Sequence, residues 1–95
     1  MRAADLLTIL TNPPQNKEYQ GIFLLIKNQK RPVTKIEVTP KNELVLHFNQ
    51  PKNGLTMKEI LVELMMNREK NIYYQLDAEI IPLYGIKETG TELMI

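Results

Sequence analysis

The sequence predicts an α+β fold in which a unit of one helix and three strands occurs twice within 95 residues. Three observations lead to this prediction. Two segments carry apolar residues at helical spacing, and six short segments have the composition of strands bounded by turn residues. In addition, the segments 22–36 and 72–86 align without a gap. A repeat decides the architecture of a chain, so it is interpreted first.

The aligned segments share their apolar pattern and one proline. Their identical positions are two isoleucines and a proline, namely Ile22/Ile72, Pro32/Pro82 and Ile36/Ile86. Amphipathic segments can resemble each other without common descent, but the shared element order and the proline at the same place favour a duplication. We therefore predict a single domain of two repeats, residues 1–48 and 55–95, joined by a linker at 49–54.

Each repeat is expected to begin with a helix. The first helix should end at Asn12 and the two prolines that follow it. The second should begin at Thr56, because Thr56 and Glu59 have the spacing of a capping box. Apolar residues recur at helical spacing in both segments: Ala3, Leu6, Leu7 and Leu10 in the first, and Met57, Ile60, Leu61, Leu64 and Met65 in the second.

Three strands are expected after each helix. In the first half, the apolar run 22–26 predicts a central strand, and the turn at 27–30 leads to a second strand that begins at Pro32. A turn at 40–42 then precedes a third strand. A unit of this size cannot bury its own apolar face. We therefore expect about six mainly antiparallel strands, in one sheet or two opposed sheets, with both helices covering a common core.

Composition narrows the class of protein. The chain has no cysteine, which excludes disulfides and thiolate metal sites, and no serine, which excludes a serine nucleophile. The first fourteen residues do not read as a signal peptide, because Asp5 interrupts the apolar run and no small-residue cleavage site follows. No apolar run reaches the roughly 20 residues of a membrane-spanning helix. A cytoplasmic protein without a membrane segment is expected.

Residues that could carry catalysis or bind a cofactor do not cluster in the sequence. His47 is the single histidine and has no second histidine or carboxylate group at metal-ligand spacing. A threonine nucleophile served by His47 stays open, but no residue indicates one. The four glycines are scattered and form no phosphate-binding loop. We expect no metal, no cofactor and no enzymatic activity.

Charge is distributed unevenly along the chain. Residues 1–54 carry eight Lys or Arg and four Asp or Glu, whereas residues 55–95 carry four and seven, within a net charge of +1. A basic cluster surrounds the turn KNQKRPVTK and continues at the next turn, and its members are Lys27, Lys30, Arg31, Lys35 and Lys41. These side chains could contact nucleic-acid phosphates or a protein partner. Alternatively, they keep an exposed turn soluble and protect an edge strand from aggregation.

Tyrosine and methionine side chains indicate a second candidate surface, since both are enriched in the centres of protein interfaces. We predict Tyr73, Tyr84 and Met66 at such an interface, and we assign Met65 and Met94 to the core. The opposite charges of the two halves would also allow copies of the chain to associate. The expected function is binding, through contact with a protein partner or self-association. The alternative is weak nucleic-acid binding through the basic cluster.

The first half also resembles a known group of proteins. A Leu-rich LLTIL followed by a proline break, then IFLLI, PVTKIEV and ELVL, is similar to small uncharacterised proteins of bacterial phages and other mobile elements. These proteins often open with a short Leu-rich helix followed by a β-hairpin with proline at the start of its second strand. The resemblance covers about half of the chain. It implies a small accessory or binding protein and transfers no catalytic residues.

Overall fold

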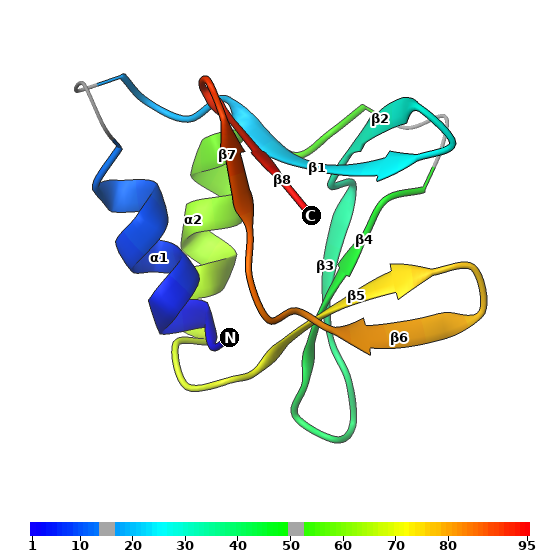
Figure 1. Cartoon of the computed structure of the whole chain (residues 1–95). Coiled ribbons are helices and arrows are strands. Elements are labelled where there is room, and N and C mark those ends of the chain that lie inside the picture. The colour runs from blue at the N-terminus through cyan, green and yellow to red at the C-terminus, as the bar shows by residue number, and fades with distance from the viewer. Residues whose placement is uncertain (14–16, 50–52) are drawn as a thin grey trace.

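The computed structural model describes residues 1–13, 17–49 and 53–95 and has the α+β composition predicted from the sequence (Figure 1). It contains two helices and eight strands. In chain order these elements are α1 (Ala3–Thr11), β1 (Gly21–Ile26), β2 (Gln29–Pro32), β3 (Lys35–Val38), β4 (Leu44–His47), α2 (Met57–Met66), β5 (Ile72–Leu76), β6 (Glu79–Pro82), β7 (Lys87–Thr89) and β8 (Glu92–Met94).

The two helices begin differently. At the start of α2, the Thr56 hydroxyl accepts a hydrogen bond from the Glu59 N–H (3.2 Å), and the Glu59 carboxylate accepts one from the Thr56 N–H (3.0 Å). This confirms the predicted capping box, which satisfies two backbone donors that have no partner within the helix. At the start of α1 only half of this arrangement is present, because the Arg2 N–H donates to Asp5 but Arg2 offers no side-chain acceptor.

The strands form two four-stranded sheets, one in the order β2-β1-β8-β7 and one in the order β3-β4-β5-β6. In each sheet, an antiparallel pair from the first half of the chain meets an antiparallel pair from the second half. The central contacts, β1 with β8 and β4 with β5, are parallel. Eight strands thus replace the six expected, and both sheets are mixed.

The expected second strand is divided because the chain changes sheets directly after Pro32. Pro32 ends β2, opposite Phe23, rather than starting the next strand. Proline has no N–H to extend the ladder. The next two N–H groups then bond to different sheets, Val33 to the Ile22 carbonyl (3.0 Å) and Thr34 to the His47 carbonyl (2.8 Å). The second half repeats the first of these bonds after Pro82, where the Leu83 N–H donates to Ile72 (2.9 Å).

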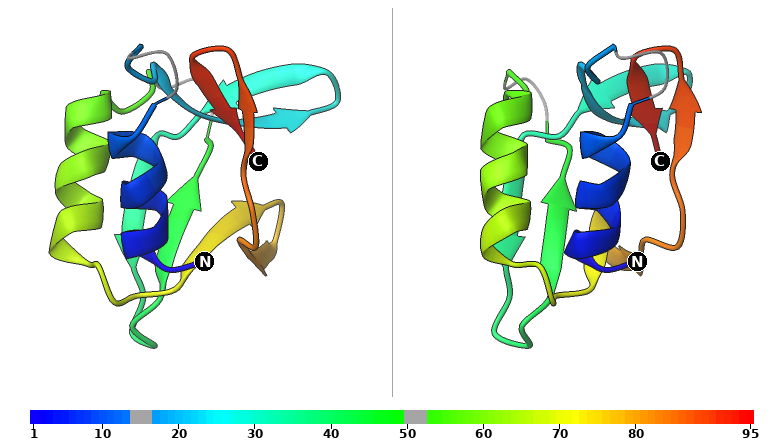
Figure 2. Two further views of the ribbon diagram at one scale, coloured as in Figure 1. Left: turned by 60° about the vertical axis from the view of Figure 1, so that its left-hand side comes forward. Right: turned by 90° about the vertical axis from the view of Figure 1, so that its left-hand side faces the viewer.

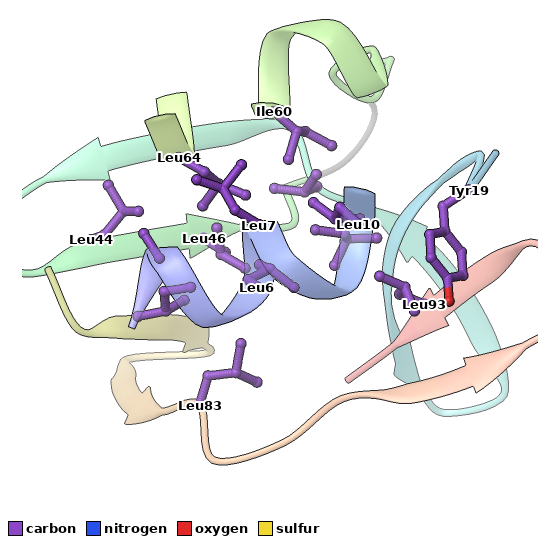
Figure 3. Packing of buried hydrophobic residues seen from close by; sticks show 14 of the residues in the cluster. Leu6, Leu7, Leu10, Tyr19, Leu44, Leu46, Ile60, Leu64, Leu83 and Leu93 are labelled. Carbon is purple, nitrogen blue, oxygen red and sulfur yellow. The ribbon is translucent and has the colours of Figure 1, made fainter. Parts of the chain in front are cut away.

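Both halves contribute to one hydrophobic core. Figure 2 shows the two helices side by side along one side of the molecule, with the strands on the other side. Figure 3 shows Leu6, Leu7 and Leu10 of α1 in the middle of the buried cluster. Side chains from both sheets and from α2 surround them, among them Ile22, Leu44, Leu46, Ile60, Leu64, Ile72, Leu83 and Leu93.

The connection into α2 is packed closely against the end of β2. The predicted linker at 49–54 lies partly outside the described residues, since 50–52 are not among them. A Cβ atom at Gly54 would lie 2.6 Å from the Cβ of Pro32, so this position has room only for glycine. The next residue, Leu55, donates its N–H to the Val33 carbonyl (2.8 Å). Within the described ranges, neither helix is long and apolar enough to cross a bilayer.

Candidate functional site

The outer surface of α2 exposes three large apolar side chains, which we call the α2 patch. Val62 is 45% exposed, Met65 55% and Met66 71%. Their spacing of three and four residues places them on one face of the helix. The prediction that Met65 belongs to the core is therefore wrong, whereas the exposure of Met66 agrees with the candidate interface. An exposed apolar face is one of the features that interaction surfaces share.

A groove of about 420 Å³ runs beside the α2 patch, between α2 and β3, and we call it the α2 groove. Its apolar lining comes from both elements and from the residue before the capping box: Ile36, Leu55 and Val62. Its charged lining contains both signs, with Lys35 and Lys58 opposite in charge to Glu59 and Glu63. A concave surface with an apolar floor and mixed charges at its rim has the character of a protein-contact site.

The capping box also sets the charge at this groove. Hydrogen bonds from the backbone and hydroxyl of Thr56 hold the pKa of Glu59 below its usual value, because they stabilise the ionised carboxylate. Glu59 lies in the first turn of α2, where the helix dipole also favours a negative charge. Glu59 is thus a fixed anion at the rim of the groove at neutral pH.

The five basic residues predicted as a cluster are spread over different surfaces. Lys30 lies on the outer face of β2, 4.8 Å from the centre of the Phe23 ring, and it pairs with Glu92 at 2.6 Å. Arg31 points to the opposite face, since neighbouring residues of a strand alternate. Lys35 belongs to the other sheet, and Lys41 lies in the turn between β3 and β4. Of the five, the structure brings only Lys27 and Arg31 to a common cavity.

The three predicted interface residues do not form one surface. Tyr84 is 84% exposed and lies two residues beyond Pro82, the partner of Tyr73 in the β5–β6 ladder. Tyr73 is partly buried, and it alternates with the core residue Ile72, so it faces away from the helices. Met66 lies on α2, on the other side of this sheet. Val62, the third member of the α2 patch, was not predicted as an interface residue. It lies outside the set of apolar residues at helical spacing from which the helix was predicted.

His47 is paired with a carboxylate on the outer face of its sheet. Its Nε2 lies 2.8 Å from an oxygen of Glu37, which belongs to the neighbouring strand β3. Neither residue lines the α2 groove. In the portions of the chain that the structure describes, no group of three or more histidine and carboxylate side chains is placed to hold a metal ion.

A buried tyrosine joins the segment before β1 to the second half of the chain. The Tyr19 hydroxyl donates to the Glu88 carboxylate in β7, and Figure 3 shows the ring beside Leu93. This hydrogen bond, together with burial and the negative charge of Glu88, raises the pKa of Tyr19. The contact links Tyr19 to strand β7.

None of the protein-family models, curated proteins or solved structures compared with this chain matches it.

Proposed function

We propose that this protein is a non-catalytic binding protein that associates with a second copy of itself through the α2 patch and the α2 groove. The observation that carries this proposal is the exposure of Val62, Met65 and Met66 on one face of a helix whose other face packs in the core. Burying these side chains against another surface would remove apolar area from water and so favour association.

The charges at the groove suit a symmetric pairing. In a two-fold dimer the same patch of both copies forms the contact. A positive residue of one copy must therefore meet a negative residue of the other, and the reverse pair forms across the axis. An antiparallel contact of two α2 helices centred on Val62 would place Lys58 of one copy within reach of Glu63 of the other, once on each side of the axis. Both residues line the groove. Such ion pairs contribute more to orientation than to affinity.

The predicted duplication concerns the pairing of two similar units within one chain. We infer that residues 1–48 and 55–95 are copies of one unit, and two features support this inference. The residue before each helix N-cap donates to an equivalent carbonyl, Leu55 to Val33 and the Met1 amine to Leu83 (2.8 Å in both cases). The two sheets also have matching strand arrangements. An experimental structure in which the two halves do not superpose would contradict the inference.

Binding as the main activity also suits what the resemblance of the first half to small uncharacterised proteins of phages and other mobile elements implies, namely an accessory or binding role. Nucleic-acid binding has less support, because Lys30 and Arg31 lie on opposite faces of β2 and Lys30 already pairs with Glu92. Phosphate contact along a backbone needs several basic side chains on one face. DNA binding at low salt that weakens when Lys30 and Arg31 become alanine would favour this alternative.

Light scattering after size exclusion, over a range of protein concentrations, tests self-association. The expected result is a mass that rises from monomer to dimer with concentration. The variant Val62→Glu should weaken dimerisation by about tenfold or more, since it places a charge in the centre of the contact. Ile80→Glu is the matched control, because Ile80 is 48% exposed but lies on β6.

Two results would overturn the proposal. A monomeric mass at every concentration excludes self-association, and equal effects of the Val62 and Ile80 variants would show that the α2 patch is not the contact. Salt provides a further check. If Lys58 and Glu63 pair across the interface, raising the ionic strength should weaken the dimer modestly.

A further inference from the structure

A cavity of about 310 Å³ lies where the tips of the two longest β-hairpins approach the end of β4. Figure 1 shows these hairpins, β1–β2 and β5–β6, projecting on the same side of the molecule. The first contributes Lys27 and Arg31 to the cavity lining, and the second contributes Gln75 and Asp77. The remaining lining comes from Ile26 of β1 and from Phe48 and Asn49, which follow β4. This cavity is separate from the α2 groove, with which it shares no lining residue.

Arg31 is the residue that gives this cavity its chemistry. It sits opposite the core residue Leu24 in the β1–β2 ladder, so its side chain starts from the inner face of the hairpin. Its Nε atom is buried and has no hydrogen-bond partner among the described residues. A buried donor without an acceptor is unfavourable, and a guanidinium group cannot lose its charge to escape this cost. The same burial keeps water and ligands away from Nε, so an acceptor that enters the cavity relieves this cost when the Arg31 side chain turns toward it.

The other charged residues of the cavity are also unpaired. Among the described residues, Lys27, Arg31 and Asp77 form none of the ion pairs within 4.0 Å, although all three line the same space. Gln75 donates from Nε2 to the Asp77 carbonyl at 2.7 Å, which fixes its side chain. The two basic groups outnumber Asp77, so the cavity favours a ligand group with negative charge.

We propose that this cavity binds a small molecule through a carboxylate or phosphate group that bonds to Arg31 and is attracted by Lys27. The planar guanidinium presents Nε and a terminal nitrogen to the same two oxygens, which matches both groups. Asp77 repels such a group and so directs it toward the Arg31 end of the cavity. The volume is at the small end of the range for ligand pockets, which limits the ligand to a few heavy atoms beyond its anionic group.

The Nε–H signal of Arg31 in proton–nitrogen NMR reports directly on this bond. Inorganic phosphate and acetate are titrated separately into the full chain, with sodium chloride at matched ionic strength as the reference. The expected result is a saturable shift of the Arg31 Nε–H signal and of the Asn49 and Gln75 side-chain amides. Saturation with only one of the two probes identifies the phosphate or the carboxylate as the preferred group.

Variants separate a specific site from general charge attraction. Arg31→Lys keeps the charge but removes the planar pair of donors, and it should weaken binding by about tenfold. Asp77→Asn should tighten binding by about threefold, because it removes the repelling charge. Lys27→Ala should weaken binding, whereas Lys41→Ala, which removes a lysine from a turn outside the cavity, should leave it unchanged.

Several outcomes would overturn the site. They are a shift reproduced by sodium chloride alone, no saturation with either probe, or unchanged binding in Arg31→Lys. If Arg31→Lys loses its dispersed amide spectrum, the variant has unfolded and cannot test the site. The Lys27 and Asp77 variants then test it, since both residues are exposed at hairpin tips. Binding that responds to neither of them contradicts the proposal.

Discussion

The two helices occupy equivalent places in the chain, yet the core covers them to different extents. α1 buries four of its nine residues, whereas α2 buries two of its ten. The three large apolar side chains that α2 exposes form the α2 patch, while no residue of α1 is among the large apolar side chains that are exposed. Apolar residues at helical spacing are therefore buried in one helix and partly exposed in the other.

The difference follows from where each helix packs. The side chains of α1 lie between α2 on one side and Leu83 on the other, so most of its circumference meets protein (Figure 3). α2 buries Ile60 and Leu64 on its inner face, and its start is held by the capping box at Thr56 and by the close approach of Gly54 to Pro32. This contrast predicts which substitutions should be costly in each helix.

Truncating a central side chain of α1 should have the largest effect. Leu6 is fully buried, so Leu6→Ala should lower the free energy of unfolding by about 2–5 kcal/mol through the cavity it leaves. The corresponding change on the exposed face of α2, Val62→Ala, should cost less than about 0.5 kcal/mol. Urea denaturation followed by circular dichroism measures both. Equal losses would mean that the α2 patch is covered in solution by something other than water.

A methyl group at Gly54 should disturb the entry into α2. Because the added Cβ would meet Pro32 at 2.6 Å, Gly54→Ala should destabilise the fold by about 1–3 kcal/mol. Gly85→Ala is the control, since nothing lies within 4 Å of its added Cβ, and it should be neutral or slightly stabilising. Thermal unfolding compares the two variants. A tolerated alanine at residue 54 would show that α2 can move away from β2 without loss.

The N-cap can be removed from α2 and introduced into α1. Thr56→Ala removes the side-chain acceptor of α2 and should cost about 1 kcal/mol. Arg2 has the same extended backbone as Thr56 but no acceptor, so Arg2→Thr should stabilise α1 by up to about 1 kcal/mol. The same denaturation measurement applies. If the threonine at residue 2 brings no gain, the half-formed arrangement with Asp5 already satisfies the start of α1.

The smallest expected effect is a pH dependence at the start of α2. The pKa of Glu59 is lower in the folded chain than its ordinary value of 4.5, so its stabilising contribution is complete above that value and is lost as the pH falls through the folded pKa. Glu59→Gln removes this titration but keeps an acceptor oxygen. The wild-type protein should therefore lose more stability than the variant between pH 5 and 3. Parallel pH profiles would contradict the assigned hydrogen bonds.

Local features of the sequence predicted local structure well. The α+β class, both helices and the capping box were predicted correctly, because each depends on residues a few positions apart, whereas the turn expected at 27–30 is shorter, since Gln29 and Lys30 already belong to β2. In this shorter turn, Lys27 and Asn28 both have positive φ and join β1 to β2 directly. The burial of Met65 was misjudged because helical spacing gives the direction of a side chain and not what covers it.

Strand pairing could not be obtained in the same way. The parallel contacts join residues 21–23 to 92–94 and 44–46 to 72–74, and no local pattern links these segments. The candidate basic cluster failed for a related reason, since Lys30 and Arg31 are neighbours in sequence but lie on opposite faces of a strand. The prediction grouped them because they are adjacent in sequence, but adjacent residues of a strand point in opposite directions.

The parallel contact between β1 and β8 has a consequence for synthesis. The partner of β1 is formed by residues 92–94, so the first sheet can close only after about seventy residues beyond β1 have been translated. Until then Ile22 and Leu24 lack the strand and the core that cover them. An apolar strand that waits this long for its partner exposes an edge on which chains can aggregate, so the distance in sequence between β1 and β8 is a cost of this topology.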